Sequence, residues 1–232
     1  MGIMRSLTAV GHRGDPYRFR ENTLDSVRSA FARGADAVEV DVRLTRDGVP
    51  VLLHDASLAR LWRADVLLGD LSVAQLRELT GGGVPTLREA LLSGNAGRVM
   101  LDLPGASPED VRKVVDEVRE CGARDRTYYC AGPRTMLAVR AADPGAEIAL
   151  TWTTLSPPRR VLLDAVRPAW LNYRFGLVGR ELTDALHADG LKVSAWTADT
   201  RWSMRRLIAA GVDSVTTNRP SLLACVRARS GR

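Results

Sequence analysis

The sequence predicts an α/β protein with a (β/α)8 barrel (TIM barrel) as one domain over residues 1–232. Helical periodicity follows most of the short apolar runs that are typical of strands. Eight such units are the number that closes a barrel of this kind. At 232 residues, with 45% hydrophobic and 26% charged side chains, the chain can bury one large core, and no Ser/Gly/Pro-rich linker divides it. The eight predicted strands begin near residues 7, 37, 98, 127, 147, 169, 192 and 214.

The first predicted strand ends in a turn with polar side chains. Residues 7–10 are apolar and lead into Gly11-His12-Arg13-Gly14, where the glycines permit close approach of the backbone. Asn22 or Thr23 is suited to cap the helix that follows, and Gly34 is suited to end it.

The second strand and its return arm form a predicted hairpin. Residues 37–44 alternate between apolar and charged side chains, residues 46–48 read as a turn, and residues 49–53 are a second apolar run. In a hairpin about Asp47-Gly48, residues whose numbers sum to about 94 face each other. This pairing brings together Glu39, Asp41, His54 and Asp55.

The hairpin begins an insertion over about residues 43–95, which we expect to sit over one rim of the barrel. Beyond it, strands and helices alternate regularly. The later helices are predicted at residues 107–120, 134–142, 159–166, 179–188 and 202–210, with a short terminal helix from Pro220.

Several polar residues lie at the carboxyl ends of predicted strands, where the chemistry of such barrels is found. A buried pair of carboxylates must be paired or must hold a metal, whereas an exposed pair is an ordinary wet strand face. Trp196 is either a core residue or a wall of the substrate pocket. The residues expected at one mouth are His12, Arg13, Glu39, Asp41, Asp102 and Trp196.

Charge and cysteine content restrict the other classes of function. The net charge of +6 is carried mainly by scattered arginines, without a dense basic run or interleaved aromatics, so we expect no nucleic-acid partner.

The apolar stretch after Met1–Arg5 is too short for a signal peptide, and no run is long enough to span a bilayer. We therefore expect a cytoplasmic protein without a stable membrane anchor. Cys121, Cys130 and Cys225 have no metal-type spacing and are interpreted as reduced packing residues.

The polar motifs, taken in order, resemble the glycerophosphodiester phosphodiesterase family. The amino-terminal motifs are Gly11-His12-Arg13-Gly14, Glu21-Asn22-Thr23, Glu39-Val40-Asp41-Val42, Thr45-Arg46-Asp47-Gly48 and His54-Asp55. The resemblance continues weakly through Pro85-Thr86-Leu87, Val193-Ser194-Ala195-Trp196-Thr197 and Thr217-Asn218-Arg219-Pro220. It covers nearly the whole chain.

The resemblance implies a metal-dependent hydrolase that uses Mg²⁺ or Ca²⁺ to cleave a small-molecule glycerophosphodiester into glycerol 3-phosphate and an alcohol. In this family pattern, His12 and His54 match the general acid/base pair and Arg13 matches the phosphate contact. Glu39 and Asp41 match two metal ligands. Carboxylate oxygens suit such hard cations, and paired histidines suit proton transfer near neutral pH.

Two departures from the family pattern keep alternatives open. The third metal motif, Glu-x-Lys in the family, is Asp102-Leu103-Pro104 here, so the carboxylate is shorter and the lysine is absent, and Arg20 replaces a proline.

One alternative function is a phospholipase D-like or cyclising phosphodiesterase that acts on lysophospholipids. Another is a catalytically weak protein that binds phosphodiesters. The head group, the preferred cation, the oligomeric state, and which histidine is the acid stay open. The apolar insertion residues that motivate the lipid alternative are Leu61, Trp62, Val66, Leu67 and Leu68.

Overall fold

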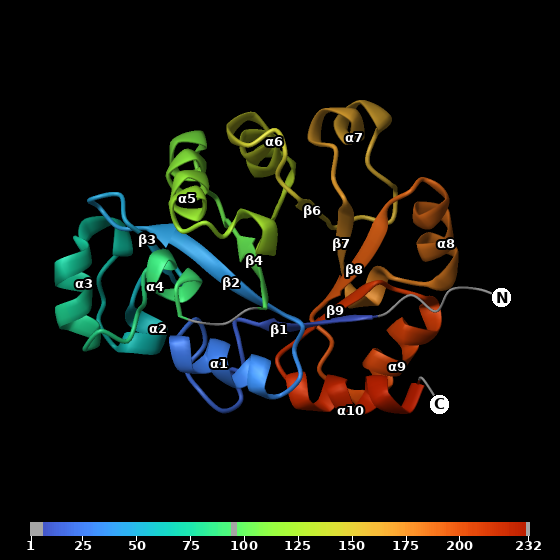
Figure 1. Ribbon diagram of the computed structural model, residues 1–232, viewed down its shortest axis with the longest axis horizontal. Coiled ribbons are helices and arrows are strands. Elements are labelled where there is room, and N and C mark those ends of the chain that lie inside the picture. The colour runs from blue at the N-terminus through green and yellow to red at the C-terminus, as the bar shows by residue number, and fades with distance from the viewer. Residues whose placement is uncertain (1–6, 94–96, 231–232) are drawn as a thin grey trace.

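The computed structural model describes residues 7–93 and 97–230, and its strands form one closed barrel ringed by helices (Figure 1). The predicted fold is confirmed, because β1 pairs in parallel with both β2 and β9 and so closes the sheet. The parallel strands are β1 (Thr8–His12), β2 (Ala37–Leu44), β4 (Arg98–Asp102), β5 (Thr127–Ala131), β6 (Ile148–Trp152), β7 (Trp170–Arg174), β8 (Lys192–Trp196) and β9 (Ser214–Thr217). The predictions about Met1–Arg5 and about an insertion end at Asn95 lie outside the described residues.

The helices around the barrel follow the predicted segments closely. Helix α5 shows why, because Ser107 caps it in a reciprocal box with Asp110 and Pro108 opens its first turn. Its four valines are buried against the barrel. The ring helices are α1 (Leu24–Ala32), α5 (Pro108–Glu120), α6 (Pro133–Ala142), α7 (Arg160–Val166), α8 (Arg180–Ala188), α9 (Arg201–Ala210) and α10 (Pro220–Ser230).

The predicted hairpin has the predicted register. Strand β3 (Pro50–Leu52) runs antiparallel to β2, with Val42 opposite Leu52 and Leu44 opposite Pro50, so the paired residue numbers sum to 94. The Leu53 N–H continues the pairing by donating to the Asp41 carbonyl at 3.0 Å. The turn at Asp47-Gly48 sets this register, and a slip by one residue would move the apolar side chains of the return strand to its other face.

The insertion packs around a hydrophobic core of its own. Figure 1 shows α2 (Ala59–Trp62) and α3 (Val73–Thr80) to one side of the barrel, beyond the β2–β3 hairpin. Of the residues that motivate a lipid groove, Leu68 is buried in this core and Trp62 and Val66 pack against it, whereas Leu67 is exposed. The buried members of this insertion core are Val51, Leu53, Leu58, Leu68, Leu71, Leu76 and Val84.

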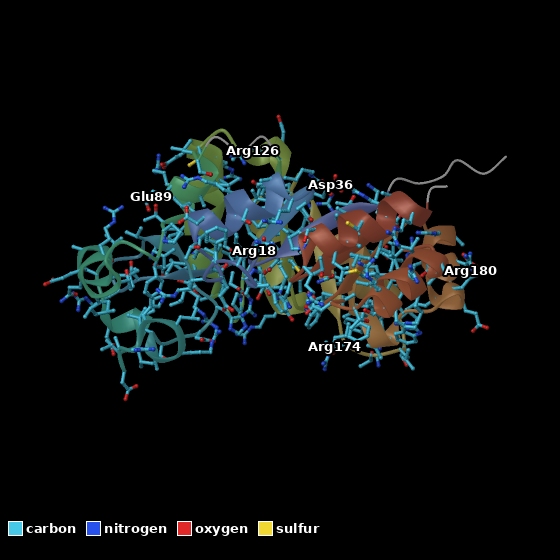
Figure 2. All side chains as sticks on the ribbon, turned by 90° about the horizontal axis from the view of Figure 1, so that it is seen from below. Arg18, Asp36, Glu89, Arg126, Arg174 and Arg180 are labelled. Carbon is cyan, nitrogen blue, oxygen red and sulfur yellow. The ribbon has the colours of Figure 1, made fainter. Side chains whose placement is uncertain are left out.

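The basic side chains are distributed over the surface. The labelled Arg18, Arg126, Arg174 and Arg180 come from different parts of the chain and lie apart in Figure 2. Many arginines pair locally with acids, as Arg88 does with two glutamates of α5. Within residues 7–93 and 97–230, no helix combines the length and the apolar character needed to cross a bilayer.

Candidate active site

The turn after β1 depends on backbone conformations that direct polar groups inward. Gly14 has φ +91°, and a Cβ there would lie 2.3 Å from Ser26 Oγ, so only glycine fits. Arg13 adopts φ +54°, an uncommon conformation for a residue with a side chain. In this conformation its N–H donates to Glu39 Oε2 at 2.9 Å. The turn therefore holds a carboxylate with a backbone donor.

Three carboxylates meet where β4 ends and where β2 passes from the barrel into the hairpin. The strand register places Asp41 opposite Asp102, and Glu39 lies two residues earlier on β2. One oxygen from each lies within 4.8 Å of those from the other two. Glu39 and Asp41 are buried, at 4% and 1% exposure. The predicted metal ligands are therefore brought together in space, and they form a candidate metal site.

The electrostatics of this cluster favour a cation. Burial raises the pKa of Glu39 well above its ordinary value, and the charges of Asp41 and Asp102 raise it further. Burial, followed by the charge of Asp41, raises the pKa of Asp102 to about 7. Buried like charges at this separation repel each other, and a hard divalent cation would relieve the repulsion while accepting oxygen ligands.

The motif Glu21-Asn22-Thr23 supplies three separate contacts. Thr23, the second of the two predicted caps, is the residue that caps α1, by accepting from the Ser26 N–H. Asn22 donates through Nδ2 to Asp41 Oδ2 at 2.8 Å and accepts from the Asp41 N–H at 3.1 Å. Glu21 accepts from Arg13 Nη1 at 2.8 Å. The motif therefore orients both a candidate metal ligand and the candidate phosphate contact.

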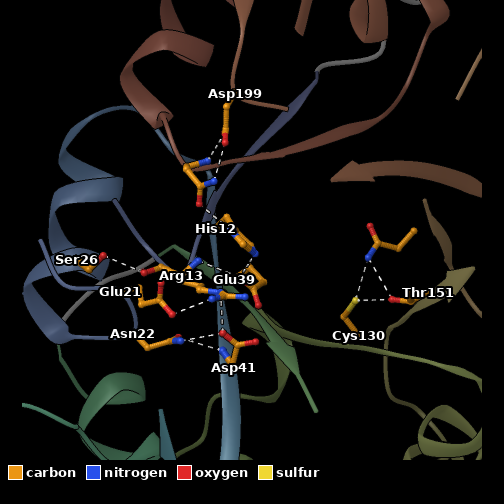
Figure 3. A network of polar contacts seen from close by, with 12 residues as sticks. His12, Arg13, Glu21, Asn22, Ser26, Glu39, Asp41, Cys130, Thr151 and Asp199 are labelled. Atoms are coloured by element: carbon orange, nitrogen blue, oxygen red, sulfur yellow. Dashed lines mark hydrogen bonds and ion pairs between the residues drawn. The ribbon is translucent and has the colours of Figure 1, made fainter. Parts of the chain in front are cut away.

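His12 is held by a chain of hydrogen bonds that runs across the closure of the barrel, from β1 to the residues after β9 (Figure 3). Its register partner on β2 is Glu39, whose Oε2 lies 3.9 Å from His12 Nε2. Nδ1 lies 2.8 Å from Asn218 Oδ1, so Nδ1 carries the proton and Nε2 is left to accept one. Asn218 is itself held by Asp199, through Nδ2 at 2.7 Å and its backbone N–H at 2.8 Å. Burial lowers the pKa of His12.

Sequence reasoning missed Asn218 and Asp199. Asn218 stands in a motif that supported the family resemblance, but the motif carried no role. A polar residue directly after the last strand of a predicted barrel is the signal that could have found it, because barrel closure places that position beside the first strand.

His54 reaches the site from the hairpin. It follows β3, and its side chain is 40% exposed. Its Nδ1 lies 2.7 Å from Asp55 Oδ1, and the other oxygen of Asp55 accepts from Arg60 Nε at 2.5 Å. Arg60 also donates to Glu21, at 2.6 Å. Asp55 therefore holds His54 and does not join the three carboxylates.

All seven predicted site residues line one cavity of about 540 Å³. This volume lies in the range of small-molecule sites. Trp196 belongs to the cavity wall, and its contact with a substrate stays a prediction. The predicted residues are His12, Arg13, Glu39, Asp41, His54, Asp102 and Trp196.

The far wall of the cavity contains polar residues that sequence reasoning did not place in the site. Cys130, interpreted from the sequence as a packing residue, is buried, and this burial raises the pKa of its thiol. Its Sγ lies 3.1 Å from Thr151 Oγ1 and accepts from Asn172 Nδ2 at 3.1 Å. Figure 3 shows Cys130 and Thr151 apart from the network around His12. Spacing along the sequence carried no signal for a cluster drawn from three strands.

Comparison with known sequences finds the family that the motifs resemble, and comparison with solved structures finds the same barrel fold. Residues 12–222 match the Glycerophosphoryl diester phosphodiesterase family. A glycerophosphodiester phosphodiesterase of Caldanaerobacter subterraneus is 26% identical over 231 residues, covering 92% of this chain and 95% of that protein. An Oleispira antarctica phosphodiesterase, solved with the product sn-glycerol-3-phosphate, superposes with a TM-score of 0.87 at 24% identity, covering 94% of this chain and 96% of that chain. The Thermotoga maritima glycerophosphodiester phosphodiesterase superposes with a TM-score of 0.82 at 23% identity, covering 95% and 98%.

Proposed function

Because the chain belongs to the glycerophosphoryl diester phosphodiesterase family, we propose that it hydrolyses glycerophosphodiesters to glycerol 3-phosphate and an alcohol. The observation that carries the proposal is one cavity that combines three clustered carboxylates, an arginine and two histidines. Together these groups supply what cleavage of a phosphodiester needs, namely charge neutralisation, orientation and proton transfer.

Glu39, Asp41 and Asp102 are the residues that would hold a divalent cation, with Mg²⁺ and Ca²⁺ as the candidates. When bound, such a cation supplies positive charge at a phosphoryl oxygen as a Lewis acid. The residues fit this use because their oxygens converge and the pKa values of Glu39 and Asp102 are raised without one. Asn22 and the Arg13 N–H hold two of these carboxylates in place.

Arg13 is the proposed phosphate contact. Its Nε lies 3.1 Å from Asp41 and its Nη1 lies 2.8 Å from Glu21, so the guanidinium plane is fixed. Nη2 makes no hydrogen bond to any residue described in the structure, so its donors are available to a phosphoryl oxygen. A guanidinium whose orientation is already set needs little reordering when the substrate binds.

His12 and His54 are the proposed acid/base pair. The lowered pKa of His12 and its Asn218 contact present a neutral Nε2, which can accept a proton from the attacking oxygen. His54 then protonates the leaving alkoxide. The attacking group is water, or the substrate's own glycerol hydroxyl by way of a cyclic phosphate, and both routes use the same two histidines. Trp196 is proposed as an apolar wall for the substrate.

The test is release of glycerol 3-phosphate from a panel of glycerophosphodiesters with Mg²⁺, Ca²⁺ or EDTA. We expect cation-dependent turnover in the wild type and its loss in His12→Ala. His187→Ala is a matched control, because this third histidine pairs with Asp213 at 2.7 Å and does not line the cavity. A folded protein that releases no glycerol 3-phosphate from any ester with either cation would refute the proposal.

A further inference from the structure

One wall of the cavity has no part in the proposed chemistry. It is formed by the carboxyl ends of β5, β6 and β7 and by the start of α6, and we call it the head-group wall. Its polar side chains are those of Cys130, Arg134, Thr135, Thr151 and Asn172. Its composition differs from that of the wall formed by β1, β2 and β4, which holds the carboxylates.

Arg134 contributes an unpaired positive charge to the head-group wall. It is the second residue of α6, it is exposed, and it lines the cavity. No hydrogen bond or ion pair joins its side chain to any residue in the described part of the chain. Arg13, the other arginine of the cavity, is by contrast held by Glu21 and Asp41. Arg134 is therefore the guanidinium of this cavity that can pair fully with a ligand.

Asn172 contributes an unpaired acceptor deep in the same wall. It is only 3% exposed, and its Nδ2 donates to Cys130 Sγ and, at 3.3 Å, to Thr151 Oγ1. Its Oδ1 has no hydrogen-bond partner among residues 7–93 and 97–230. A buried acceptor without a partner is destabilising, and a hydroxyl donor from a ligand would offset this cost. The side chain thus points to a ligand group that donates a hydrogen bond, such as a hydroxyl, which the quaternary ammonium of choline cannot do.

The distribution of charge restricts what the head-group wall can bind. Among the described residues, the acidic side chains that line the cavity all lie on β2 and β4. A cationic alcohol at the head-group wall would meet Arg134 and no carboxylate. An anionic alcohol would meet Arg134 together with the positive end of the α6 dipole, where Gly132 provides no capping side chain.

We infer that the head-group wall binds the leaving alcohol and selects one that carries both hydroxyl groups and a second anionic group, such as a phosphorylated polyol, over choline or ethanolamine. This inference rests on the proposed function and adds the class of ester. Arg134 pairs with the anionic group, and Asn172 Oδ1 accepts from a hydroxyl. The wall is thereby a determinant of specificity that takes no part in proton transfer.

The first experiment compares kcat/KM for glycerophosphocholine, glycerophosphoinositol and glycerophosphoinositol phosphate. For the wild type we expect the phosphorylated ester to exceed the choline ester by at least about tenfold, the range of one charge-assisted hydrogen bond. Arg134→Ala should remove this preference, by raising KM for the phosphorylated ester and by raising kcat/KM for the choline ester as the repulsion is lost, and the preference should be partly rescued in Arg134→Lys. Arg112→Ala, an exposed arginine of α5 that does not line the cavity, is the matched control. Equal effects of Arg134→Ala on all three esters would overturn the inference.

Asn172→Leu tests the hydroxyl contact. We expect a lower kcat/KM for both inositol esters and little change for the choline ester. A uniform loss for all esters would assign Asn172 to the glycerol phosphate that they share, and would overturn the placement of the alcohol on this wall. If Asn172→Leu does not fold, the Arg134 variants decide the question.

Failure of the inference and failure of the proposed function are distinguishable. Hydrolysis without a head-group preference refutes only the inference, whereas a lack of any hydrolysis refutes the proposed function. In the second case, calorimetric titration with inositol 1-phosphate and with choline still tests the wall. Weaker binding of inositol 1-phosphate by Arg134→Ala than by Arg112→Ala supports the inference, and equal binding by the two variants overturns it.

Discussion

The two histidines reach one cavity from regions of very different construction. His12 ends β1, which is paired on both sides, and its ring is held by Asn218 across the closure of the barrel. His54 follows β3, an edge strand that pairs with β2 and, through a single bridge at Val51, with Thr86, and it is held by its neighbour Asp55. The His12 side chain is 21% exposed and the His54 side chain is 40% exposed.

This difference indicates how the chain divides the proposed proton transfers. The barrel fixes His12 with the stability of the whole sheet, whereas the position of His54 depends on the small insertion core. Regions with few buried contacts can open without global unfolding. The two histidines can therefore contribute to one reaction and still differ in their sensitivity to the leaving group and to local packing.

The largest expected effect separates the roles of the two histidines. Replacing either by alanine should lower kcat for a glycerophosphodiester by about 10²- to 10⁴-fold, the usual range for a general acid or base. An aryl phosphodiester with a nitrophenolate leaving group needs no proton donor, so it should restore much of the rate to His54→Ala but not to His12→Ala. Steady-state kcat for both esters is the measurement. Rescue of His12→Ala instead would reverse the assignment of acid and base.

The next effect concerns packing. Leu76 is fully buried in the insertion core, and Leu76→Ala should destabilise that core by about 2–5 kcal/mol. We expect faster hydrogen exchange in residues 49–87, unchanged exchange in the barrel strands, and lower activity because His54 loses its position. Leu101→Ala, at an equally buried position in the barrel, should lower the midpoint of global unfolding instead. If Leu76→Ala loosens barrel and insertion together, the two regions are one cooperative unit.

A smaller effect is that two carboxylates change the stability of the protein in opposite directions with pH. The pKa of Asp102 in the barrel is raised from an ordinary 3.8 to about 7, so its folded state binds the proton more tightly than its unfolded state. Its contribution to stability is therefore present at low pH and is lost as the pH rises through about 7. Asp55 in the insertion has a lowered pKa, because hydrogen bonds from Arg60 and His54 outweigh the upward effect of burial. Its contribution is instead lost as the pH falls.

Thermal unfolding in EDTA measures this difference. As the pH rises from about 5.5 to 7, ionisation of Asp102 should lower the free energy of unfolding of the cation-free protein by about 2 kcal/mol. Asp102→Asn should reduce this loss of stability, and Asp55→Asn should leave it unchanged. Added Mg²⁺ or Ca²⁺ should raise the midpoint most at the high end of the range, where the carboxylates are ionised. A cation-free midpoint that does not change with pH would show that these carboxylates do not repel each other as the structure implies.

Features that depend on local sequence were predictable. The alternation of residues 37–44 and a single turn at Asp47-Gly48 allow one register, and the observed pairs sum to 94 as predicted. The ends of the strands were predictable because short apolar runs alternate with helical segments along the chain. Because the strands of such a barrel share one direction, the side chains at their carboxyl ends could be assigned to one mouth from the order of the elements alone.

Contacts that depend on distant closure were not predictable. Asn218 lies 206 residues from His12, and only the pairing of β1 with β9 brings them together. Arg134 and Asn172 stand in stretches without a recognisable motif, and their importance comes from what they do not contact. A missing partner is a property of the packed structure, which a linear pattern cannot express.

The smallest expected effect tests whether the contact across the barrel closure tunes His12 or only supports the fold. Burial lowers the pKa of His12 overall, although the hydrogen bond that His12 Nδ1 donates to Asn218 Oδ1 raises it. Asn218→Ala should therefore lower this pKa further and move the acid limb of the kcat/KM profile to lower pH, with kcat reduced about tenfold because the ring loses its orienting partner. Thr217→Val removes another hydrogen bond to Asp199 without touching His12, so it should leave the limb in place. A lower rate with an unmoved acid limb in Asn218→Ala would make Asn218 a structural residue, and the proton transfer at His12 would then depend on burial alone.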